Sequence, residues 1–353
     1  MEVEWIGHLG IPSGYGTASM HYVEELNNMV DLKCTTLDRN MYMYGWMEKL
    51  AEKKLDNPVK VTHAIPNEIP DSLGDACYTV FEFHQAPEEW ERKLEDVHFV
   101  FTPSEYSKES LSTVCDKDKI KVINHGVSPE FNPYGGKVEF AKSRTIKWKN
   151  SLDMPSFKFL SVFEWVERKC PDRLIQAFCE EFDVEEDVCL ILKTDHYATP
   201  VRRMIKKLAG NNNVYHFRQF VTDISNLYRG ANAYISVGPE GWGETLSEAM
   251  ACGMPTIGPN WSGTTEFMNS FNSFQIEPDD AIPIKYNKME AIVKPWFTYQ
   301  PPKIDSIRSN MRAVYEENCE NIDAITRNAV QDMQEFTWEK ATSKMVKYLE
   351  ELR

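Results

Sequence analysis

The residues whose types and spacing most clearly suit ligand binding or catalysis lie in the segment PEGWGETLSEAMACG, residues 239–253. Glu240 and Glu248 stand on either side of the glycine-rich segment 241–243. Glycines let the backbone approach a ligand closely, and the free N–H groups at the start of a following helix favour a phosphate. Carboxylates repel phosphate but accept hydrogen bonds from hydroxyls. Two acids around a phosphate-sized gap therefore suit a nucleotide sugar, which carries sugar hydroxyls on both sides of its diphosphate.

A structural explanation of the same acids stays open. Thr245 has the position of a helix N-cap, and Thr245-x-x-Glu248 has the spacing of a capping box, in which the acid binds backbone N–H groups. On spacing alone, helix capping explains Glu248 as well as ligand binding does. Glu240 is harder to explain as an ordinary solvated loop acid because it adjoins Gly-Trp-Gly.

The composition limits the classes of partner. The 353 residues are 42% hydrophobic and 26% charged, which is typical of a globular protein with two domains. The net charge of −15 argues against nucleic acid as the main partner and disfavours strong attachment to anionic membranes, although a local basic patch is compatible with this total. The eight cysteines are scattered singly, no apolar run reaches the length of a membrane span, and the N-terminus lacks the pattern of a signal peptide. We expect a cytoplasmic protein with reduced thiols.

Short apolar runs that alternate with amphipathic segments must position these residues. Twelve runs predict strands: 3–9, 32–37, 59–65, 77–83, 97–103, 120–124, 157–163, 188–194, 214–219, 231–237, 255–258 and 274–276. Helical patterns fall at 18–29, 88–94, 106–114, 171–182, 201–208 and 246–251, and the stretch 304–353 is helical without strands. Alternating strands and helices predict parallel sheets, and this number of strands favours two doubly wound sheets over one.

A break in the pattern near residues 128–138 contains two prolines and two glycines. We therefore predict an α/β protein with Rossmann-like domains at 1–135 and 136–335 that face a cleft, and a C-terminal helical segment at 336–353. Ligands of such sheets bind at the carboxyl ends of strands.

The segment from Glu240 to Gly258 resembles the E-x7-E signature of retaining, GT-B fold glycosyltransferases of family 4. The residues Trp261-Ser262-Gly263 and Glu266 are similar to the continuation of that signature, and SVFEWVERKCPDRLIQAF resembles another segment of the family. FTPSEYSKESL and INHGVSPEFNP extend the similarity into the first half, where it is looser. The resemblance implies transfer of a sugar from a nucleoside diphosphate, with an N-terminal acceptor-side domain and a C-terminal donor domain. It also implies that the last helix, Trp338–Leu352, packs back on the first domain.

The resemblance assigns roles to residues of the second half. It implies that Glu248 binds the donor ribose, that Glu240 faces the transferred sugar, and that Lys169 neutralises the diphosphate. Glu164 stands where the family usually has an arginine, and Arg168 is the nearest replacement. Without the resemblance, the sequence favours an interpretation of Arg168 and Lys169 as two solvent-exposed charges at the start of a helix. The expected donor site also includes the remaining residues of the glycine-rich segment and the helix start: Gly241, Trp242, Gly243, Glu244 and Thr245.

The first strand is followed by IPSGYGTAS, in which Gly14 and Gly16 precede Asp38 at the end of the second strand. This spacing resembles a dinucleotide fingerprint that lacks its third glycine, and it keeps an NAD-dependent oxidoreductase as a rival hypothesis. The glycosyltransferase resemblance instead implies a glycine-rich loop that approaches the donor diphosphate and the acceptor. An ordinary tight turn explains the segment equally well.

Other candidates lie at further predicted strand ends. Glu82 and His84 stand at the end of one predicted strand of the first half. The family resemblance implies that a residue at this strand end orients the sugar or the acceptor, which makes both catalytic candidates beside Glu240 and Lys169. His63 is a weaker candidate of the same kind, and His125 is expected to have a structural role. In the second half, Lys193, Arg218 and Val221 are candidates to contact the base.

We expect no metal and no cofactor, because no His/Cys cluster has the spacing of zinc ligands and Asp116-Lys117-Asp118 lies in a polar turn. The sequence therefore predicts a metal-independent, retaining hexosyltransferase that uses a GDP- or UDP-sugar and a glycan, lipid-linked or small-molecule acceptor. The alternatives are a nucleotide-sugar hydrolase or epimerase and a non-catalytic nucleotide-sugar binding module. The sequence leaves the base, the sugar, the acceptor, the linkage and the oligomeric state open.

Overall fold

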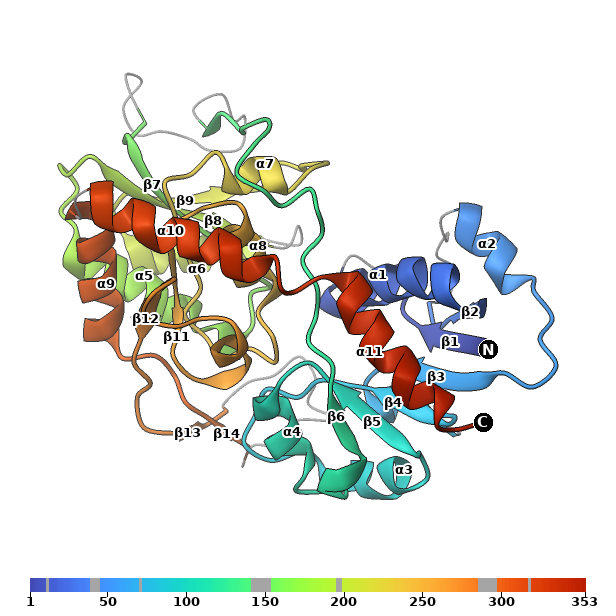
Figure 1. Ribbon diagram of the computed structural model, residues 1–353. Coiled ribbons are helices and arrows are strands. Elements are labelled where there is room, and N and C mark those ends of the chain that lie inside the picture. The colour runs from blue at the N-terminus through green and yellow to red at the C-terminus, as the bar shows by residue number, and fades with distance from the viewer. Residues whose placement is uncertain are drawn as a thin grey trace. The chain divides into compact units, whose positions relative to one another are not determined.

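The computed structural model describes residues 1–10, 13–38, 45–69, 72–140, 154–194, 199–284, 297–316 and 319–353 (Figure 1). The chain forms two compact units. The first contains Met1–Gly126 and Phe336–Arg353, and the second contains Val127–Glu290 and Lys294–Glu335. Each unit has its own parallel sheet and its own core.

The sheet of the first unit has six parallel strands in the order β2-β1-β3-β4-β5-β6. Their bounds are β1 Glu2–Gly7, β2 Asp31–Thr36, β3 Val59–His63, β4 Ala76–Tyr78, β5 Phe99–Thr102 and β6 Ile120–Val122. Because the chain runs from β1 outward to β2 and then returns to β3 on the other side of β1, the strand order reverses between β1 and β3. The loops that follow these two strands therefore meet at one edge of the sheet.

Helices cover this sheet and include the last segment of the chain. Their bounds are α1 Gly14–Met29, α2 Gly45–Ala51, α3 Glu91–Glu95, α4 Glu105–Leu111 and α11 Trp338–Glu350, with short 3-10 turns η1 Pro66–Glu68, η2 Glu88–Trp90 and η3 Lys117–Lys119. The indole of Trp338 stacks on His21 of α1 with ring centroids 4.8 Å apart. Met345 and Leu349 are buried in the same core as Leu26 of α1. The C-terminal helix thus belongs to the first unit, as the sequence predicts.

The second sheet repeats this architecture in the order β12-β11-β10-β7-β8-β9. Its strands are β7 Phe157–Val162, β8 Val188–Lys193, β9 Val214–Phe217, β10 Ala233–Ile235, β11 Thr256–Pro259 and β12 Phe274–Ile276. A separate antiparallel pair joins β13 Ile282–Pro283 to β14 Thr298–Tyr299. The strand order reverses between β7 and β10. All twelve predicted strands are present, and the prediction of two doubly wound parallel sheets is confirmed.

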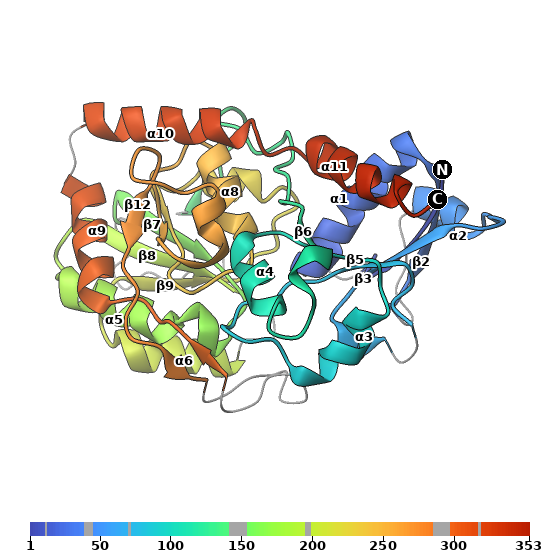
Figure 2. The same cartoon turned by 60° about the horizontal axis from the view of Figure 1, so that its bottom comes forward.

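The helices of the second unit lie on both faces of its sheet. They are α5 Pro171–Glu181, α6 Thr199–Ala209, α7 Ser225–Tyr228, α8 Glu244–Ala251, α9 Ile304–Glu316 and α10 Cys319–Met333, with turns η5 Glu167–Lys169 and η6 Ser262–Glu266. Figure 2 shows α5 and α6 together on one face of the sheet, and α8 with α10 on the opposite face. The prediction that the last fifty residues are helical is confirmed for the part of them that is described.

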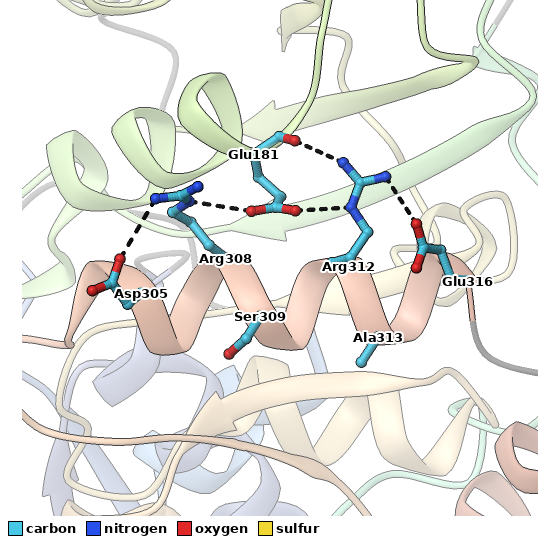
Figure 3. Close-up of a pocket in the computed structure, with 7 residues that line it drawn as sticks. All are labelled: Glu181, Asp305, Arg308, Ser309, Arg312, Ala313 and Glu316. Atoms are coloured by element: carbon cyan, nitrogen blue, oxygen red, sulfur yellow. Dashed lines mark hydrogen bonds and ion pairs between the residues drawn. The ribbon is translucent and has the colours of Figure 1, made fainter.

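A network of ion pairs joins α5 to α9 (Figure 3). Arg308 and Arg312 both bind the carboxylate of Glu181, at 3.1 Å and 2.8 Å, and Arg312 also binds Glu186 at 2.7 Å. A surface hollow of about 530 Å³ lies beside these side chains. Because carboxylates already surround both arginines, this hollow offers little excess positive charge to an anion.

Candidate functional site

The expected donor residues of the second unit lie where the order of its strands reverses. The loop after β7 leads into η5, which carries Arg168 and Lys169, and the loop after β10 carries Glu240. Gly238 lets these loops meet, because a Cβ atom at this position would lie 2.1 Å from the carbonyl oxygen of Arg168. A side chain at residue 238 would push the two loops apart.

Glu240 is the centre of a compact charged cluster. It is only 6% exposed, and its carboxylate accepts a hydrogen bond from Lys169 Nζ. Arg168 Nη1 lies 3.6 Å from the second carboxylate oxygen and donates to the carbonyl oxygen of Pro239 at 3.2 Å. The structure therefore brings together three residues that the sequence singled out, two cations and one buried acid. These three side chains carry two positive charges and one negative charge.

The backbone of Glu240 is fixed by the turn η6. Its N–H donates to Ser262 Oγ at 3.1 Å, and its carbonyl oxygen accepts from the N–H of Gly263 at 2.8 Å. Trp242 is 3% exposed, and its indole packs on the ring of Phe267 with centroids 4.9 Å apart. Trp242 therefore supports the loop from within the core, and its side chain does not offer a surface to a ligand.

The predicted capping box at Thr245 and Glu248 is wrong. Gly243 is the N-cap residue, with a φ of 105° that favours glycine, and α8 begins at Glu244. Thr245 thus lies inside the first turn of α8 and is not its N-cap residue. Glu248 falls in the second turn, beyond the reach of the unpaired N–H groups at the helix start.

Glu248 instead contacts a buried tyrosine. Its Oε2 accepts a hydrogen bond from the hydroxyl of Tyr228 at 2.7 Å. Burial, reinforced by the charges of Glu244 and Glu130, raises the pKa of Glu248 to about 8, although the Tyr228 hydrogen bond opposes this shift. The carboxyl group is therefore largely protonated at neutral pH and can both donate and accept hydrogen bonds.

The candidates for the base lie on neighbouring strands of the same sheet. Lys193 is the last residue of β8 and pairs in register with Val162 at the end of β7. Arg218 directly follows β9 and is exposed, and Val221 lies three residues further along the chain. Glu164, at the position of the family arginine, is exposed. Arg168, rather than residue 164, supplies the guanidinium near Glu240.

In the first unit, the expected glycine-rich loop is in part a helix. Gly14 and Gly16 lie in the first turn of α1, and Ser13 caps that helix by accepting a hydrogen bond from the N–H of Gly16 at 3.1 Å. The serine cap explains why the helix starts earlier than the apolar pattern predicted. Residues 11 and 12 of the predicted loop lie outside the described residues.

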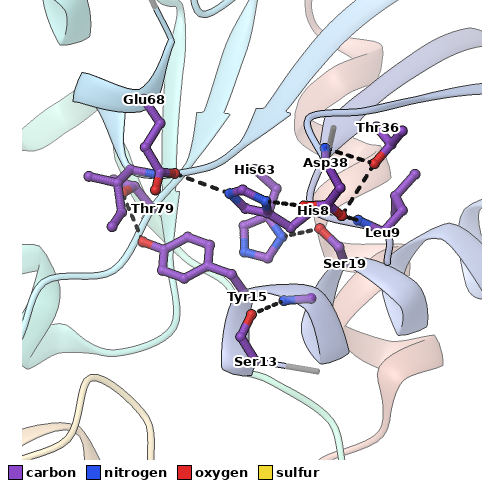
Figure 4. A network of polar contacts seen from close by, with 12 residues as sticks. His8, Leu9, Ser13, Tyr15, Ser19, Thr36, Asp38, His63, Glu68 and Thr79 are labelled. Atoms are coloured by element: carbon purple, nitrogen blue, oxygen red, sulfur yellow. Dashed lines mark hydrogen bonds and ion pairs between the residues drawn. The ribbon is translucent and has the colours of Figure 1, made fainter. Parts of the chain in front are cut away.

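Two residues that the sequence did not single out, His8 and Glu68, meet Asp38 at the edge of the first sheet (Figure 4). The imidazole of His8 lies between Asp38, at 2.7 Å from Nδ1, and Glu68, at 3.2 Å from Nε2. The hydrogen bond with Glu68, together with Asp38 and against the effect of burial, raises the pKa of His8 to about 9. His8 stands directly after β1, a strand-end position that was its only signal in the sequence.

The carboxylate of Asp38 binds backbone groups of its own unit. Its Oδ2 accepts from the backbone N–H groups of Leu9, at 2.8 Å, and Gly10, at 2.7 Å. Burial raises the pKa of Asp38, but the hydrogen bonds from His8 and these N–H groups outweigh it, so the net shift is downward. Asp38 therefore ties the end of β2 to the loop after β1, which is a different task from binding the ribose of NAD.

Two further candidates, Glu82 and His84, are not at the end of a strand as predicted, because β4 ends at Tyr78. The hydroxyl of Tyr15 accepts from the N–H of Val80 at 2.9 Å and so takes a backbone group that would have continued the strand. Glu82 and His84 lie in the following loop, where they alternate with the buried residues Phe81 and Phe83.

The two remaining candidate histidines of the first unit, His63 and His125, are buried. The imidazole of His63 is 1% exposed and hydrogen-bonds with Ser19 Oγ at 2.7 Å. Burial lowers the pKa of His63 well below its usual value, so the ring is neutral. His125 is 6% exposed and packs against Trp338 with ring centroids 5.3 Å apart, in agreement with the expected structural role.

The described part of the chain offers neither a metal-binding cluster nor a membrane-spanning helix. Within it, no group of three or more His, Cys, Asp or Glu side chains has the arrangement of a metal site. Asp116 and Asp118 are exposed, and Asp116 accepts from the N–H of Asp118 at 3.0 Å, as expected for a polar turn. Among the described helices, none combines the length and apolar character needed to cross a bilayer.

Comparison with known proteins identifies the class of the second unit. Residues 142–289 match the family model described as "Glycosyl transferases group 1". The second unit carries a glycosyltransferase domain. The enzyme class predicted from the sequence is thereby confirmed. A search of curated proteins finds no match.

Solved structures resemble the whole chain. A glycosyltransferase from Rickettsia africae ESF-5 has 15% identity and a TM-score of 0.72, over 99% of this chain and 98% of its own. Sucrose-phosphate synthase from Thermosynechococcus elongatus has 14% identity and a TM-score of 0.69, over 100% and 99% of the two chains. Anabaena HepE, solved in complex with UDP-glucose, has 14% identity and a TM-score of 0.65, over 99% and 100%. At this level of identity the similarity shows the fold, and the fold is GT-B.

Proposed function

We propose that this glycosyltransferase transfers a sugar from a nucleoside diphosphate to an acceptor hydroxyl with retention at the anomeric carbon and without a metal, as a member of family 4. The observation that carries the proposal is the placement of Arg168 and Lys169 around the buried carboxylate of Glu240, where the order of the second sheet reverses. Open α/β sheets bind their ligands at such points.

The charges of this cluster match those of a donor diphosphate. Arg168 and Lys169 supply two positive charges, and both lie beside the carboxylate of Glu240. A diphosphate that enters the site shares the two cations, and the N–H groups at the start of α8 add partial positive charge beside Gly243. These groups can stabilise the leaving diphosphate without a metal ion, which is the basis for proposing metal independence.

The two acids suit hydroxyl groups on either side of that diphosphate. Glu240 is held by its own backbone hydrogen bonds, and its carboxylate is ready to accept from hydroxyls of the transferred sugar. One carboxyl oxygen of Glu248 accepts from Tyr228, which leaves the other for the ribose. In the first unit, Glu82 and His84 remain proposed partners of the sugar or the acceptor.

The reaction breaks the bond between the anomeric carbon and the diphosphate oxygen and forms a bond from that carbon to the acceptor oxygen. The acceptor proton passes to the leaving phosphate oxygen on the same face of the sugar, which gives retention. Arg168 and Lys169 hold the developing negative charge, and Glu240 faces the positive charge that develops on the sugar. No covalent bond to Glu240 is required by this route.

UDP is the first donor nucleotide to test. HepE, which shares the fold, was solved with UDP-glucose, whereas no described residue of this chain distinguishes uracil from guanine.

We also propose a cytoplasmic location, supported by the cysteines whose side chains are described. These are reduced thiols at positions 34, 77, 115, 170, 179, 189 and 252.

Thermal unfolding with UDP, GDP, ADP and NAD⁺, each with and without EDTA, tests the donor site. A ligand at a hundred times its dissociation constant adds about 2.7 kcal/mol of stability. We expect UDP or GDP to raise the melting temperature equally in both conditions, and the matching nucleotide sugar to give a product with the donor's anomeric configuration by NMR when an acceptor is supplied. A response to NAD⁺ alone, or a response that EDTA abolishes, contradicts the proposal.

A further inference from the structure

The outer face of α6 is an exposed cationic surface on an acidic protein. Arg202, Arg203, Lys206 and Lys207 are all exposed, and the helix segment 199–209 contains no acidic residue. This one segment therefore carries four positive charges, whereas the whole chain has a net charge of −15. Among the described residues, no carboxylate lies within ion-pair distance of any of the four cations.

Apolar side chains extend from the buried stripe of α6 onto the same surface. Val201, Ile205 and Ala209 are buried at intervals of four residues. Met204 and Leu208, which are 45% and 39% exposed, flank this stripe on the helical wheel and lie next to the cations at 203 and 207. The exposed surface of α6 is therefore amphipathic, with a cationic centre and an apolar margin.

Two of the neighbouring acids are directed toward another element. The thiol of Cys179 in α5 contacts the carbonyl oxygen of Ala209, so the C-terminal ends of α5 and α6 adjoin. Of the six acids in residues 180–187, Glu181 and Glu186 bind Arg312 of α9. Their charge is thus compensated away from α6, and Figure 2 shows α6 on the outside of its sheet.

An exposed aromatic side chain lies at the same edge of the sheet. Because α6 connects the carboxyl end of β8 to the amino end of β9, it begins at the carboxyl edge of the sheet. Phe220 follows the end of β9 at this edge and is 71% exposed. Phe, like Trp and Leu, is typical of the apolar side of segments that lie at a membrane interface.

We propose that the outer face of α6 docks the protein on a bilayer that contains anionic phospholipids. Lys and Arg side chains close to such a surface each contribute roughly a fivefold gain in affinity, which corresponds to ~1 kcal/mol. Met204 and Leu208 are placed to enter the headgroup region beside them. Nucleic acid fits less well, because these exposed apolar side chains would meet a charged phosphate backbone.

Co-sedimentation with large unilamellar vesicles tests this inference on the full-length protein without any sugar donor, so the result does not depend on the proposed transfer reaction. We expect binding to vesicles of phosphatidylcholine with about one-third phosphatidylserine, and none to phosphatidylcholine alone. The double variant Lys206→Gln/Lys207→Gln should bind roughly 25-fold more weakly, as two lost cations predict. Sodium chloride at 0.5 M should release most of the wild-type protein, because salt screens exposed charges.

The matched control is Lys344→Gln/Lys347→Gln, which removes two exposed lysines from α11 and changes the net charge equally. We expect it to bind vesicles within about twofold of the wild type, and the melting temperatures of both variants to be unchanged. A third variant, Met204→Gln, should weaken binding about threefold without changing its dependence on salt. The proposal is overturned by absence of binding to anionic vesicles, by equal losses in the two lysine variants, or by α6-dependent binding to RNA or heparin without binding to vesicles.

Discussion

The substitution Lys169→Met isolates the charge at the centre of the candidate site. It removes the ammonium group that binds Glu240 and keeps an unbranched side chain. Among the described residues, the Glu240 side chain, which is 8% exposed, then retains Arg168 Nη1 at 3.6 Å as its one cationic partner. Removing one member of a buried ion pair costs about 3–5 kcal/mol. Because the Lys169 side chain is 16% exposed and Arg168 remains, we expect a loss of about 2 kcal/mol.

A double-mutant cycle separates this pairwise energy from other effects of the substitution. Glu240→Gln alone leaves Lys169 without its carboxylate, and Lys169→Met/Glu240→Gln removes both charges together. We expect the double variant to be about 1–2 kcal/mol more stable than the sum of the single losses predicts. The assay is urea denaturation of each variant, followed by tryptophan fluorescence and circular dichroism.

The control for the cycle is Lys303→Met, which changes an exposed lysine of the same unit and should alter stability by less than about 0.5 kcal/mol. The reasoning fails if the free energy of unfolding of Lys169→Met differs from that of the wild type by less than about 0.5 kcal/mol. It also fails if the two single losses simply add, since Glu240 and Lys169 would then not interact.

Three further substitutions test other parts of the account. Gly238→Ala should destabilise the protein by roughly 3 kcal/mol in urea denaturation, because its Cβ would lie 2.1 Å from the carbonyl oxygen of Arg168; wild-type stability would contradict the loop contact. Glu248→Gln should flatten the decline in melting temperature between pH 5 and pH 9. The pKa of Glu248 in the folded protein, about 8, exceeds the ordinary glutamate value of 4.5, so wild-type stability falls as the pH rises through this window. The amide keeps the Tyr228 hydrogen bond. His8→Gln should cost most stability below pH 6.5 and almost none above pH 9, because the pKa of His8 is raised from 6.5 to about 9 in the folded protein; a loss independent of pH would show that the His8 charge is not involved.

The strands were predictable because parallel strands covered on both faces appear as continuous apolar runs. Val188–Lys193, buried along nearly its whole length, is such a run. The end of β4 was not predictable, because the backbone N–H of Val80 donates to the hydroxyl of Tyr15 and not to a neighbouring strand. Tyr15 lies more than sixty positions earlier in the chain. The helix starts at Gly14 and Glu244 were missed for a related reason. Glycines before a helix suggest a loop, and only the conformations of Ser13 and Gly243 show where each helix begins.

The candidate site was predictable in part. A family resemblance selected Arg168, Lys169 and Glu240, but the contact between Lys169 and Glu240 spans 71 positions and no local spacing encodes it. The pairing of His8 with Glu68 spans 60 positions and had no motif at all. Such contacts depend on the reversal of strand order, which brings together loops that are distant in sequence.

The most direct test of the proposed donor site is calorimetric titration of UDP, GDP and their nucleosides into the wild type and Lys169→Met. If Lys169 binds the diphosphate, the variant should lose about 30- to 100-fold in affinity for the nucleoside diphosphate, or roughly 2–3 kcal/mol for a lost charge-assisted contact. Its weak affinity for the free nucleoside should not change. Equal losses for nucleoside and diphosphate, or no loss for the diphosphate, would contradict the assignment of this cluster as the diphosphate site.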